Sequence, residues 1–349
     1  MKKRTRVITL FIVLLLIWNV ILTAIIVNNN SKQESITDIN QTTVTGFSTD
    51  LTKVFEENKS SVVTVEAMGN ISSGIIYKTS DDAVYVVTTF HGVAADNFLH
   101  VIFDSGATYE ASVEGYDSFG DIAVLKVETN LQVTPVKLGN SDLLNDGEFL
   151  ACIGTPKSIE YASSDELAIV SSSLRTILNS VEFNEDTYEY YQSAIQLSSN
   201  VKEGYSGSPI FNMAGEVQGL ITMKDDTAVF ALPINEVKII ADNIIEGVEY
   251  SKIQFGFKPL VIADLESYQK NELNIPLDVN NGLYISNVLS SSLANSLGIK
   301  SGDIIESINE RSINKYSDLL EVEYTDTRSF EIKVVRDNEE ISLKGSIND

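Results

Sequence analysis

The chain has 349 residues, with 49 acidic and 25 basic side chains and a net charge of −24. Four of the basic residues lie in the first six positions, so the rest of the chain carries 21 − 49 = −28. A surface with this excess of negative charge repels phosphate backbones, which argues against nucleic acid as a partner. The length accommodates two or three domains.

Residues 8–27 form a run without any charged side chain, long enough to cross a bilayer as a single helix. The basic residues before the run are expected to stay in the cytoplasm. The run ends at Val27 without the small residues of a cleavage site, which favours an uncleaved anchor over a signal peptide. We therefore expect residues 1–30 to be a single-pass anchor in the cell membrane, residues 31–46 a polar linker, and everything beyond Asn28 extracytoplasmic.

Short β-type runs separated by turn residues follow the linker and form two series. The first series covers 61–67, 73–77, 83–88, 99–103, 110–115 and 122–127, and the second covers 149–153, 167–172, 192–196, 215–223 and 228–232. Two series of this kind predict two small β-barrels. Apolar residues at helical spacing in 235–245 predict a helix that closes this domain. The one cysteine, Cys152, rules out an intrachain disulfide and is expected to be buried.

The turn Gly-Tyr-Ser-Gly-Ser-Pro at 204–209 exposes one serine between two apolar stretches. A serine hydroxyl is a weak nucleophile that needs a base, and donors must stabilise the charge that develops on the attacked carbonyl. Gly204 reaches backbone angles closed to other residues, so Gly204, Tyr205 and Ser206 form the predicted oxyanion hole, with the amides of Gly204 and Ser206 as donors. Taken alone, the same motif is also typical of an ordinary turn.

The base must be His91 or His100, because the chain has only these two histidines. His91 ends an apolar strand, whereas His100 lies within the next one. Asp121 opens the apolar run 122–126, where a carboxylate is costly unless its charge is needed, as it is beside an imidazolium. We predict that His91 is the base and that Asp121 orients it. The alternative for Asp121 is a cap or turn role, which nearby Asp117 could equally fill.

Five ordered motifs resemble the signatures of the HtrA/DegP serine proteases over about residues 47–349. They are Ser-Ser-Gly-Ile-Ile at 72–76, Thr-Thr-Phe-His-Gly-Val at 88–93, Asp-Ile-Ala-Val-Leu-Lys at 121–126, the segment from 195 to 212, and Phe-Ala-Leu-Pro at 230–233. The resemblance implies a mainly β protein with a chymotrypsin-like double β-barrel at 47–250. It also implies a triad of His91, Asp121 and Ser206, in the chain order of chymotrypsin-type enzymes.

The nucleophile loop departs from the family pattern at several positions. Ser208 replaces a glycine, and Lys202 and Glu203 replace the two residues that usually precede the turn. If position 208 needed a positive φ, a residue other than glycine would cost about 1 kcal/mol or more and could tilt the oxyanion amides. Thr89 and Gly92 also differ from the residues typical around the histidine. Ser208, Lys202 and Glu203 support a rival hypothesis, in which the chain is a catalytically weak scaffold that captures protein termini through a PDZ domain.

The predicted specificity pocket comprises Asn200, Val201, Ile221 and Thr222, on the basis of the family resemblance. No acidic residue stands at its expected base, so a preference for Lys or Arg is not expected. We expect small or medium apolar residues to be preferred.

A further series of elements over 251–349 resembles the PDZ domain appended to HtrA proteases. It comprises a strand that begins at Ile253, a strand at 282–288, a short helix at 291–297, the segment 302–309, a helical stretch near 317–324, and strands at 330–335 and 340–343. Phe255-Gly256-Phe257 matches the loop whose amides hold the terminal carboxylate of a bound peptide. The peptide itself then pairs as a strand along the edge of the domain. The predicted carboxylate-binding loop is therefore Gln254, Phe255, Gly256 and Phe257. A β-bulge is the alternative interpretation of the same three residues.

The sequence thus predicts a double β-barrel and a PDZ domain behind a transmembrane helix. The expected function is an extracytoplasmic serine endopeptidase that cleaves unfolded or damaged proteins and binds peptide C-termini at its PDZ domain. The family also implies a homotrimer. No phosphate loop, metal-ligand spacing or cofactor fingerprint occurs in the sequence, so neither a metal nor a cofactor is expected.

Overall fold

The computed structural model describes residues 47–94, 98–183, 186–199, 201–224, 228–249 and 252–347. The predicted membrane anchor and polar linker lie outside these residues. Within the described ranges, no helix is both long and apolar enough to span a membrane.

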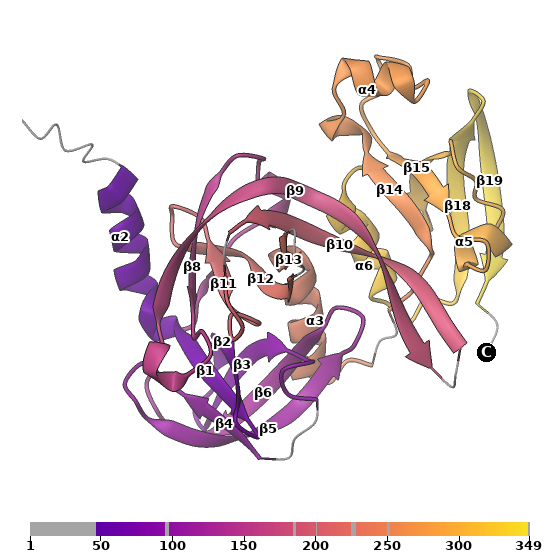
Figure 1. Cartoon of the computed structure of the whole chain (residues 1–349). Coiled ribbons are helices and arrows are strands. Elements are labelled where there is room, and N and C mark those ends of the chain that lie inside the picture. Colours follow the sequence, from indigo (N-terminus) through magenta and orange to yellow (C-terminus); the bar gives the residue numbers. More distant parts are fainter. Residues whose placement is uncertain are drawn as a thin grey trace, which may run out of the picture. The chain divides into compact units, whose positions relative to one another are not determined.

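The first six strands close into a barrel in the order β1-β2-β3-β6-β5-β4 (Figure 1). They are β1 (Val62–Ala67), β2 (Asn70–Thr79), β3 (Ala83–Thr89), β4 (Leu99–Ile102), β5 (Thr108–Asp117) and β6 (Ile122–Glu128). Valine and isoleucine suit these strands because branched side chains pack well on a pleated surface. Val65, Ile76, Val86 and Leu125 are fully buried in the barrel interior. The six strands predicted for this barrel are confirmed, with β2 and β5 longer than expected.

A second sheet has the strand order β11-β8-β9-β10-β13-β12-β7, and β11 also pairs with β12. This extra pairing closes the sheet on itself, so the second predicted barrel is present. Its strands are β7 (Lys137–Leu138), β8 (Phe149–Gly154), β9 (Ser164–Phe183), β10 (Asp186–Ser198), β11 (Pro209–Phe211), β12 (Glu216–Lys224) and β13 (Val229–Pro233). Cys152 is fully buried in this barrel, and burial raises the pKa of its thiol.

Strands β9 and β10 run on together as one long ribbon (Figure 1). They pair in register from Ala194 and Arg175 to Asp186 and Phe183, far beyond the predicted segments 167–172 and 192–196. The outer part of the ribbon mixes polar residues with Tyr, Val and Ile, so it lacks the apolar run that marked its inner part. The pairing between the two arms therefore extends both strands where the hydrophobic pattern of either arm alone did not.

Two helices flank the barrels: α2 (Phe47–Asn58) before the first strand and α3 (Ile234–Glu246) after the last. Helix α3 confirms the helix predicted at 235–245. Gly247 ends it in the left-handed conformation, at φ +64°. The apolar face of α3 is buried through Val237, Ile240 and Ala241.

A third sheet follows α3, with strands in the order β14-β15-β16-β18-β19 and β17 paired to β16. The elements of this domain are β14 (Phe257–Val261), α4 (Ser267–Glu272), β15 (Leu283–Val288), α5 (Leu293–Ser296), β16 (Ile304–Ile308), β17 (Arg311–Ser312), α6 (Tyr316–Glu323), β18 (Ser329–Arg336) and β19 (Glu339–Ser346). The strand expected to begin at Ile253 begins instead at Phe257. Gly256 lies at φ +75°, outside the extended region, and this interrupts the strand.

A buried group of charged side chains joins α3 to the segment that leads into the third sheet. Lys252 Nζ lies 2.6 Å from Glu236 Oε1, and their side chains are only 2% and 0% exposed. Tyr324 donates a hydrogen bond to the same oxygen over 2.8 Å, and Ser193 donates to Oε2 over 2.8 Å. Glu323 lies nearby, and its main-chain oxygen accepts from the Ile253 amide. Glu236 therefore has partners from the segment at 252, from the residue that follows α6 and from β10.

Candidate active site

The structure brings together the three residues predicted for the triad. Nδ1 of His91 lies 2.7 Å from Oδ2 of Asp121, and Nε2 of His91 lies 3.2 Å from Oγ of Ser206. His91 follows β3, Asp121 immediately precedes β6, and Ser206 lies in the loop before β11. His100 lies apart in β4, where its neighbours across the sheet are Glu66 and Glu110.

Asp121 is held to the histidine segment by its main chain as well as its carboxylate. Its main-chain oxygen accepts from the Phe90 amide over 3.0 Å, and Oδ1 accepts from the His91 amide over 2.8 Å. Its φ of +56° is uncommon, but Asp is among the residues that tolerate it. The turn role considered for this acid belongs to Asp117, whose Oδ1 accepts from the Gly120 amide over 2.5 Å.

The surroundings of His91 favour its protonated form. The hydrogen bond to Asp121 raises the pKa of His91, partial burial opposes this, and the charge of Asp121 raises it further. With Nδ1–H donated to Asp121, Nε2 is the nitrogen that can accept the Ser206 proton. The His91 side chain is 52% exposed, so a substrate can reach it.

The loop before Ser206 leaves two amides available for an oxyanion. Gly204 lies at φ +95°, and the Glu203 carbonyl is turned toward the Lys157 amide over 2.9 Å. Among the described residues, neither the Gly204 nor the Ser206 amide has an acceptor. Tyr205 supplies no donor to the predicted oxyanion hole, because its amide donates to the Lys202 carbonyl over 3.3 Å.

Tyr205 contributes packing beneath the turn instead. Its side chain is 4% exposed, and its hydroxyl donates to the Ser164 carbonyl over 3.3 Å. The ring lies against Gly154, where an added Cβ would come within 2.6 Å of it. Nothing in the local sequence indicated that this tyrosine points into the second barrel.

The conformation at Ser208 does not require glycine. Positive φ occurs at Gly204 and at Gly207, but not at Ser208. The Ser208 side chain is completely buried, and a Cβ at Gly154 would lie 2.2 Å from its hydroxyl oxygen. The backbone strain considered at this position is therefore absent, and the side chain is accommodated by the glycine that faces it.

Two of the residues predicted for the specificity pocket lie behind the nucleophile turn. Val201 and Ile221 are 1% and 2% exposed and belong to one apolar cluster with Tyr205. The Ile221 carbonyl accepts from the Gly207 amide over 2.7 Å, and its amide donates to the Ser208 carbonyl over 2.9 Å. Thr222 is half-buried, and Asn200 lies outside the described residues.

The predicted carboxylate-binding loop is held firmly at its turn. The Phe255 carbonyl accepts from the Ala294 amide over 2.8 Å, and the Gly256 carbonyl accepts from the Leu289 amide over 2.9 Å. The rings of Phe255 and Phe257 stack with centroids 5.3 Å apart, and both are buried. These side chains anchor the loop in the core of the third sheet's domain.

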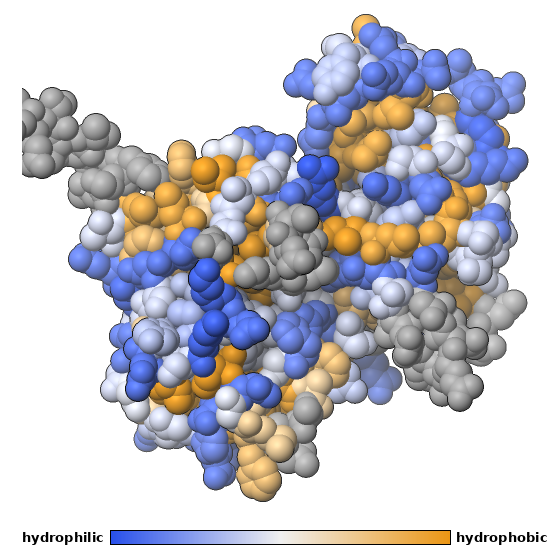
Figure 2. Space-filling model, viewed as in Figure 1, coloured by the Kyte–Doolittle hydropathy of each residue, from blue (hydrophilic) through white to orange (hydrophobic). Residues whose placement is uncertain are grey.

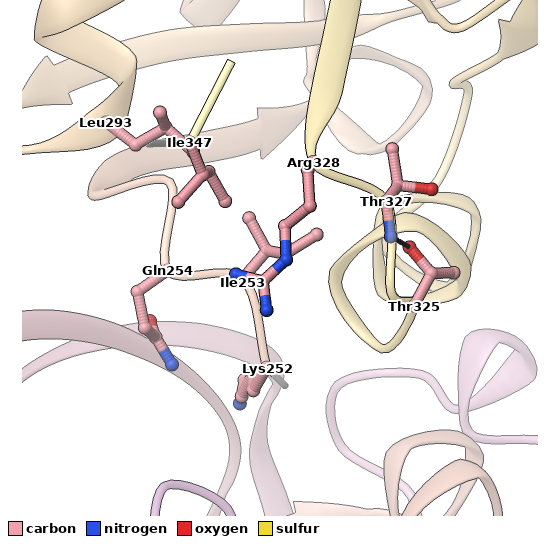
Figure 3. A pocket seen from close by; sticks show the side chains of 8 residues that line it. All are labelled: Lys252, Ile253, Gln254, Leu293, Thr325, Thr327, Arg328 and Ile347. Atoms are coloured by element: carbon pink, nitrogen blue, oxygen red, sulfur yellow. Dashed lines mark hydrogen bonds between the residues drawn. The ribbon is translucent and has the colours of Figure 1, made fainter. Parts of the chain in front are cut away.

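A pocket of about 260 Å³ lies beside this loop (Figure 3). It is lined by Gln254 of the loop and by Arg328, with apolar walls that include Ile253, Leu293 and Ile347. Gln254 Nε2 is buried, with no hydrogen-bond partner in the described structure. The Arg328 guanidinium is exposed and likewise has no carboxylate partner among the described residues. Over the same residues, no cluster of three or more His, Cys, Asp or Glu side chains could hold a metal ion.

Two family models match the chain in succession. Residues 72–220 match the trypsin-like peptidase domain, and residues 251–335 match the PDZ domain. Solved structures of the HtrA-type protease AlgW share the fold. The complex with a tripeptide has a TM-score of 0.59 at 20% identity, and the match covers 85% of this chain and 96% of that structure. The complex with a decapeptide has a TM-score of 0.54 at 18% identity, and the match covers 85% of this chain and 97% of that structure.

Curated relatives extend the similarity to most of the chain. An HtrA-like serine protease of Staphylococcus haemolyticus is 28% identical over 80% of this chain and 45% of its own length. An HtrA-like serine protease of Staphylococcus epidermidis is 27% identical over 95% of this chain and 60% of its own length. The Do-like HtrA serine protease of Lactobacillus helveticus is 29% identical over 78% of this chain and 67% of its own length. The chain thus spans about half the length of the first two relatives. The chain is thus similar to HtrA-type serine proteases, with a region that matches the trypsin-like peptidase domain followed by one that matches the PDZ domain.

Proposed function

We propose that the chain is a serine endopeptidase in which Ser206 is the nucleophile, His91 the general base and Asp121 the residue that orients the base. The observation that carries this proposal is the pair of contacts from His91, 2.7 Å to Asp121 and 3.2 Å to Ser206. The two available amides, of Gly204 and Ser206, lie in the same loop as the nucleophile.

The reaction follows from these positions. Nε2 of His91 takes the Ser206 proton as Oγ attacks the scissile carbonyl, and the amides of Gly204 and Ser206 stabilise the resulting oxyanion. The imidazolium then gives its proton to the leaving amine, and the acyl-enzyme forms. Water, activated by the same imidazole, releases the acid product and restores Ser206. Asp121 stabilises the imidazolium throughout and fixes the tautomer.

The test uses the ectodomain, residues 31–349, with casein and an active-serine fluorophosphonate probe. Wild type is expected to cleave casein and to react with the probe, and Ser206→Ala and His91→Ala are each expected to abolish most cleavage. Nucleophile and base act as a unit, so the double variant is expected to be no worse than either single one. His100→Ala is the matched control and keeps activity. An inert wild type, even with a PDZ-binding peptide present, would leave the scaffold hypothesis in place.

We propose that the PDZ domain binds the free C-termini of peptides and that binding regulates cleavage. The AlgW structures that share this fold contain a decapeptide or a tripeptide. In this chain, Gln254 and the exposed Arg328 line the pocket beside the predicted loop. A guanidinium is a strong partner for a carboxylate.

Peptide binding to the ectodomain tests this part of the proposal. A peptide with a free apolar C-terminus is expected to bind, and its amidated form to bind more weakly. Arg328→Gln is expected to weaken the free peptide more than the amidated one. Arg311→Gln removes another exposed arginine of the same domain, which is already paired with Glu321, and serves as control. Equal binding of free and amidated peptides would rule out carboxylate capture, and faster casein cleavage with bound peptide would support regulation.

We further propose that the substrates are unfolded or damaged proteins outside the cytoplasm, reached from a single-pass anchor at 8–27. The uncharged run and its basic flank support this topology. Protease added to spheroplasts is expected to digest the two folded domains, and protection of both would contradict it.

Assembly as a homotrimer is also proposed, on the family resemblance. Figure 2 shows hydrophobic side chains among the hydrophilic ones on the surface. Among the described residues, the cross-strand neighbours Phe149 and Ile169 are 42% and 37% exposed. Sedimentation of the ectodomain should give three times the monomer mass, and a monomer at all concentrations would exclude the trimer.

A further inference from the structure

Ser73 lies in β2 of the first barrel and is completely buried, yet its contacts reach the nucleophile loop of the second barrel. Its hydroxyl donates to the Gly204 carbonyl over 2.8 Å and accepts from the Thr155 amide over 2.9 Å. Its own amide donates to the Ser206 carbonyl over 2.8 Å. Ser73 thus holds the carbonyl groups of the same two residues whose amides are available for the oxyanion.

These contacts complete a set that fixes each successive peptide group of the loop. The carbonyls of Glu203 and Tyr205 accept from the amides of Lys157 and Ser208, each over 2.9 Å. Those of Gly204 and Ser206 accept from Ser73. The Gly204 and Ser206 N–H groups share their peptide groups with the Glu203 and Tyr205 carbonyls, and Ser73 fixes the peptide group that follows each of them. Rotation is therefore restricted on both sides of Gly204 and Ser206, so their amides keep their directions. Ser73 supplies two of the four bonds.

Ser73 is itself fixed by its surroundings. Thr88 Oγ1 donates to the Ser73 carbonyl over 2.7 Å. Gly207 passes so close that an added Cβ would lie 2.0 Å from the same carbonyl oxygen. The first barrel therefore presents the Ser73 hydroxyl and amide to the loop from a rigid position.

We propose that Ser73 is a positioning residue for the oxyanion hole: its hydroxyl and amide orient the loop so that the Gly204 and Ser206 N–H groups meet the developing negative charge. This inference rests on the proposed serine-protease function. Preorganised donors act mainly in the transition state, so loss of the Ser73 hydroxyl should lower kcat and leave KM nearly unchanged.

The test compares Ser73→Ala with Ser72→Ala in the ectodomain, using a peptide substrate and its boronate analogue, whose adduct with Ser206 is tetrahedral. Removing one oxyanion donor outright costs roughly 10²–10³ in kcat, so losing a residue that only orients donors should cost roughly ten- to a hundredfold. Boronate affinity should fall in the same proportion, and the pH at half-maximal activity should not move. Ser72→Ala should match wild type, since its hydroxyl makes only a 3.5 Å contact with the Val65 carbonyl.

Ser73→Thr, which keeps the hydroxyl, should retain more of kcat than Ser73→Ala. Unchanged kcat in Ser73→Ala would overturn the proposal. So would a loss of thermal stability together with unchanged boronate affinity, because that result would show a purely structural role. An inactive wild type would instead refute the proposed function, so the two failures are distinguishable.

Discussion

The Lys252 ammonium and the Glu236 carboxylate form an ion pair of 2.6 Å that is almost completely removed from solvent. Burial works against the charged ammonium, but the attraction of Glu236, Glu323 and Asp117 outweighs it and raises the pKa of Lys252. The pair links the helix that ends the peptidase domain to the start of the PDZ domain.

Lys252→Met should therefore destabilise the ectodomain by about 3–5 kcal/mol, because it leaves a buried carboxylate without its counter-charge. Urea unfolding measures the change. Lys53→Met, which removes an exposed ion pair with Glu57 at 3.8 Å, should change stability by less than about 1 kcal/mol. If Lys252→Met were as mild as this control, the ion pair would not contribute to stability. The double variant Lys252→Met/Glu236→Leu should lose less than the sum of the two single changes.

Glu323 makes the stability of the folded protein fall as pH rises toward 8. Burial raises the pKa of Glu323 to about 8, although Lys252 lowers it in part and Glu236 raises it. The folded state holds a proton that the unfolded state releases near its ordinary pKa, so this carboxyl destabilises the fold progressively as pH rises toward 8.

Glu323→Gln should remove this dependence, because an amide keeps the shape without ionising. The two proteins should have similar unfolding free energies near about pH 5. Near about pH 8 the variant should be more stable than wild type, by several kcal/mol at most, because each pKa unit of difference between the folded and unfolded states is worth about 1.4 kcal/mol. Unfolding in urea across this range measures the difference. A constant difference at every pH would show that Glu323 ionises normally.

Asp121→Asn should lower kcat by about 10⁴, the size known for this change in trypsin-type triads, because the amide favours the wrong histidine tautomer. Asn tolerates the φ of +56° and can still accept from the His91 amide, so unfolding free energy should change little. Asp104→Asn, at an exposed aspartate bonded to Ser163, is the control for substitution alone. Full activity of Asp121→Asn would refute its assigned role.

Activity should fall as pH drops through the pKa of His91, because the protonated imidazole cannot accept the Ser206 proton. The hydrogen bond to Asp121 is the largest cause that raises this pKa above 6.5. The midpoint of kcat/KM should therefore lie above 6.5 in wild type and move down in Asp121→Asn. A midpoint that does not respond to Asp121 would show that another group controls the profile.

Gly154→Ala should impair catalysis far more than Ser208→Gly. The added Cβ would lie 2.2 Å from the Ser208 hydroxyl and 2.6 Å from the Tyr205 ring, so the nucleophile turn must shift. Ser208→Gly leaves the backbone angles unchanged and should alter kcat by less than about threefold, since no positive φ is relieved. Combining the two changes should recover part of the loss. A faster Ser208→Gly enzyme would show instead that the serine disturbs the oxyanion loop.

The strands, and the proximity of His91, Asp121 and Ser206, could be predicted because their signals are local. Apolar runs such as 83–89 mark buried strands, and His91 and Asp121 stand directly at the ends of two of them. The PDZ elements were predicted for the same reason. The start of β14 was misplaced, where Gly256 interrupts an otherwise apolar segment, and the short elements α4 and β17 were not predicted.

Contacts between distant parts of the chain could not be predicted in this way. The hydroxyl of Ser73 bonds a carbonyl 131 positions away, and nothing near Ser73 or Gly204 marks that partnership. The outer β9–β10 ribbon depends on pairing between its arms rather than on the pattern of either one. The inward orientation of Tyr205 depends on the space left by Gly154.

The bonds from Ser73 to the nucleophile loop bear on when activity arises during synthesis. The residue that steadies the loop belongs to the first barrel, whereas Gly204, Ser206 and the supporting strand through Ile221 belong to the second. A nascent chain that has folded only its first barrel lacks Ser206, and a second barrel on its own lacks His91, Asp121 and the hydrogen bonds from Ser73. Proteolytic competence should therefore appear only after both barrels have docked.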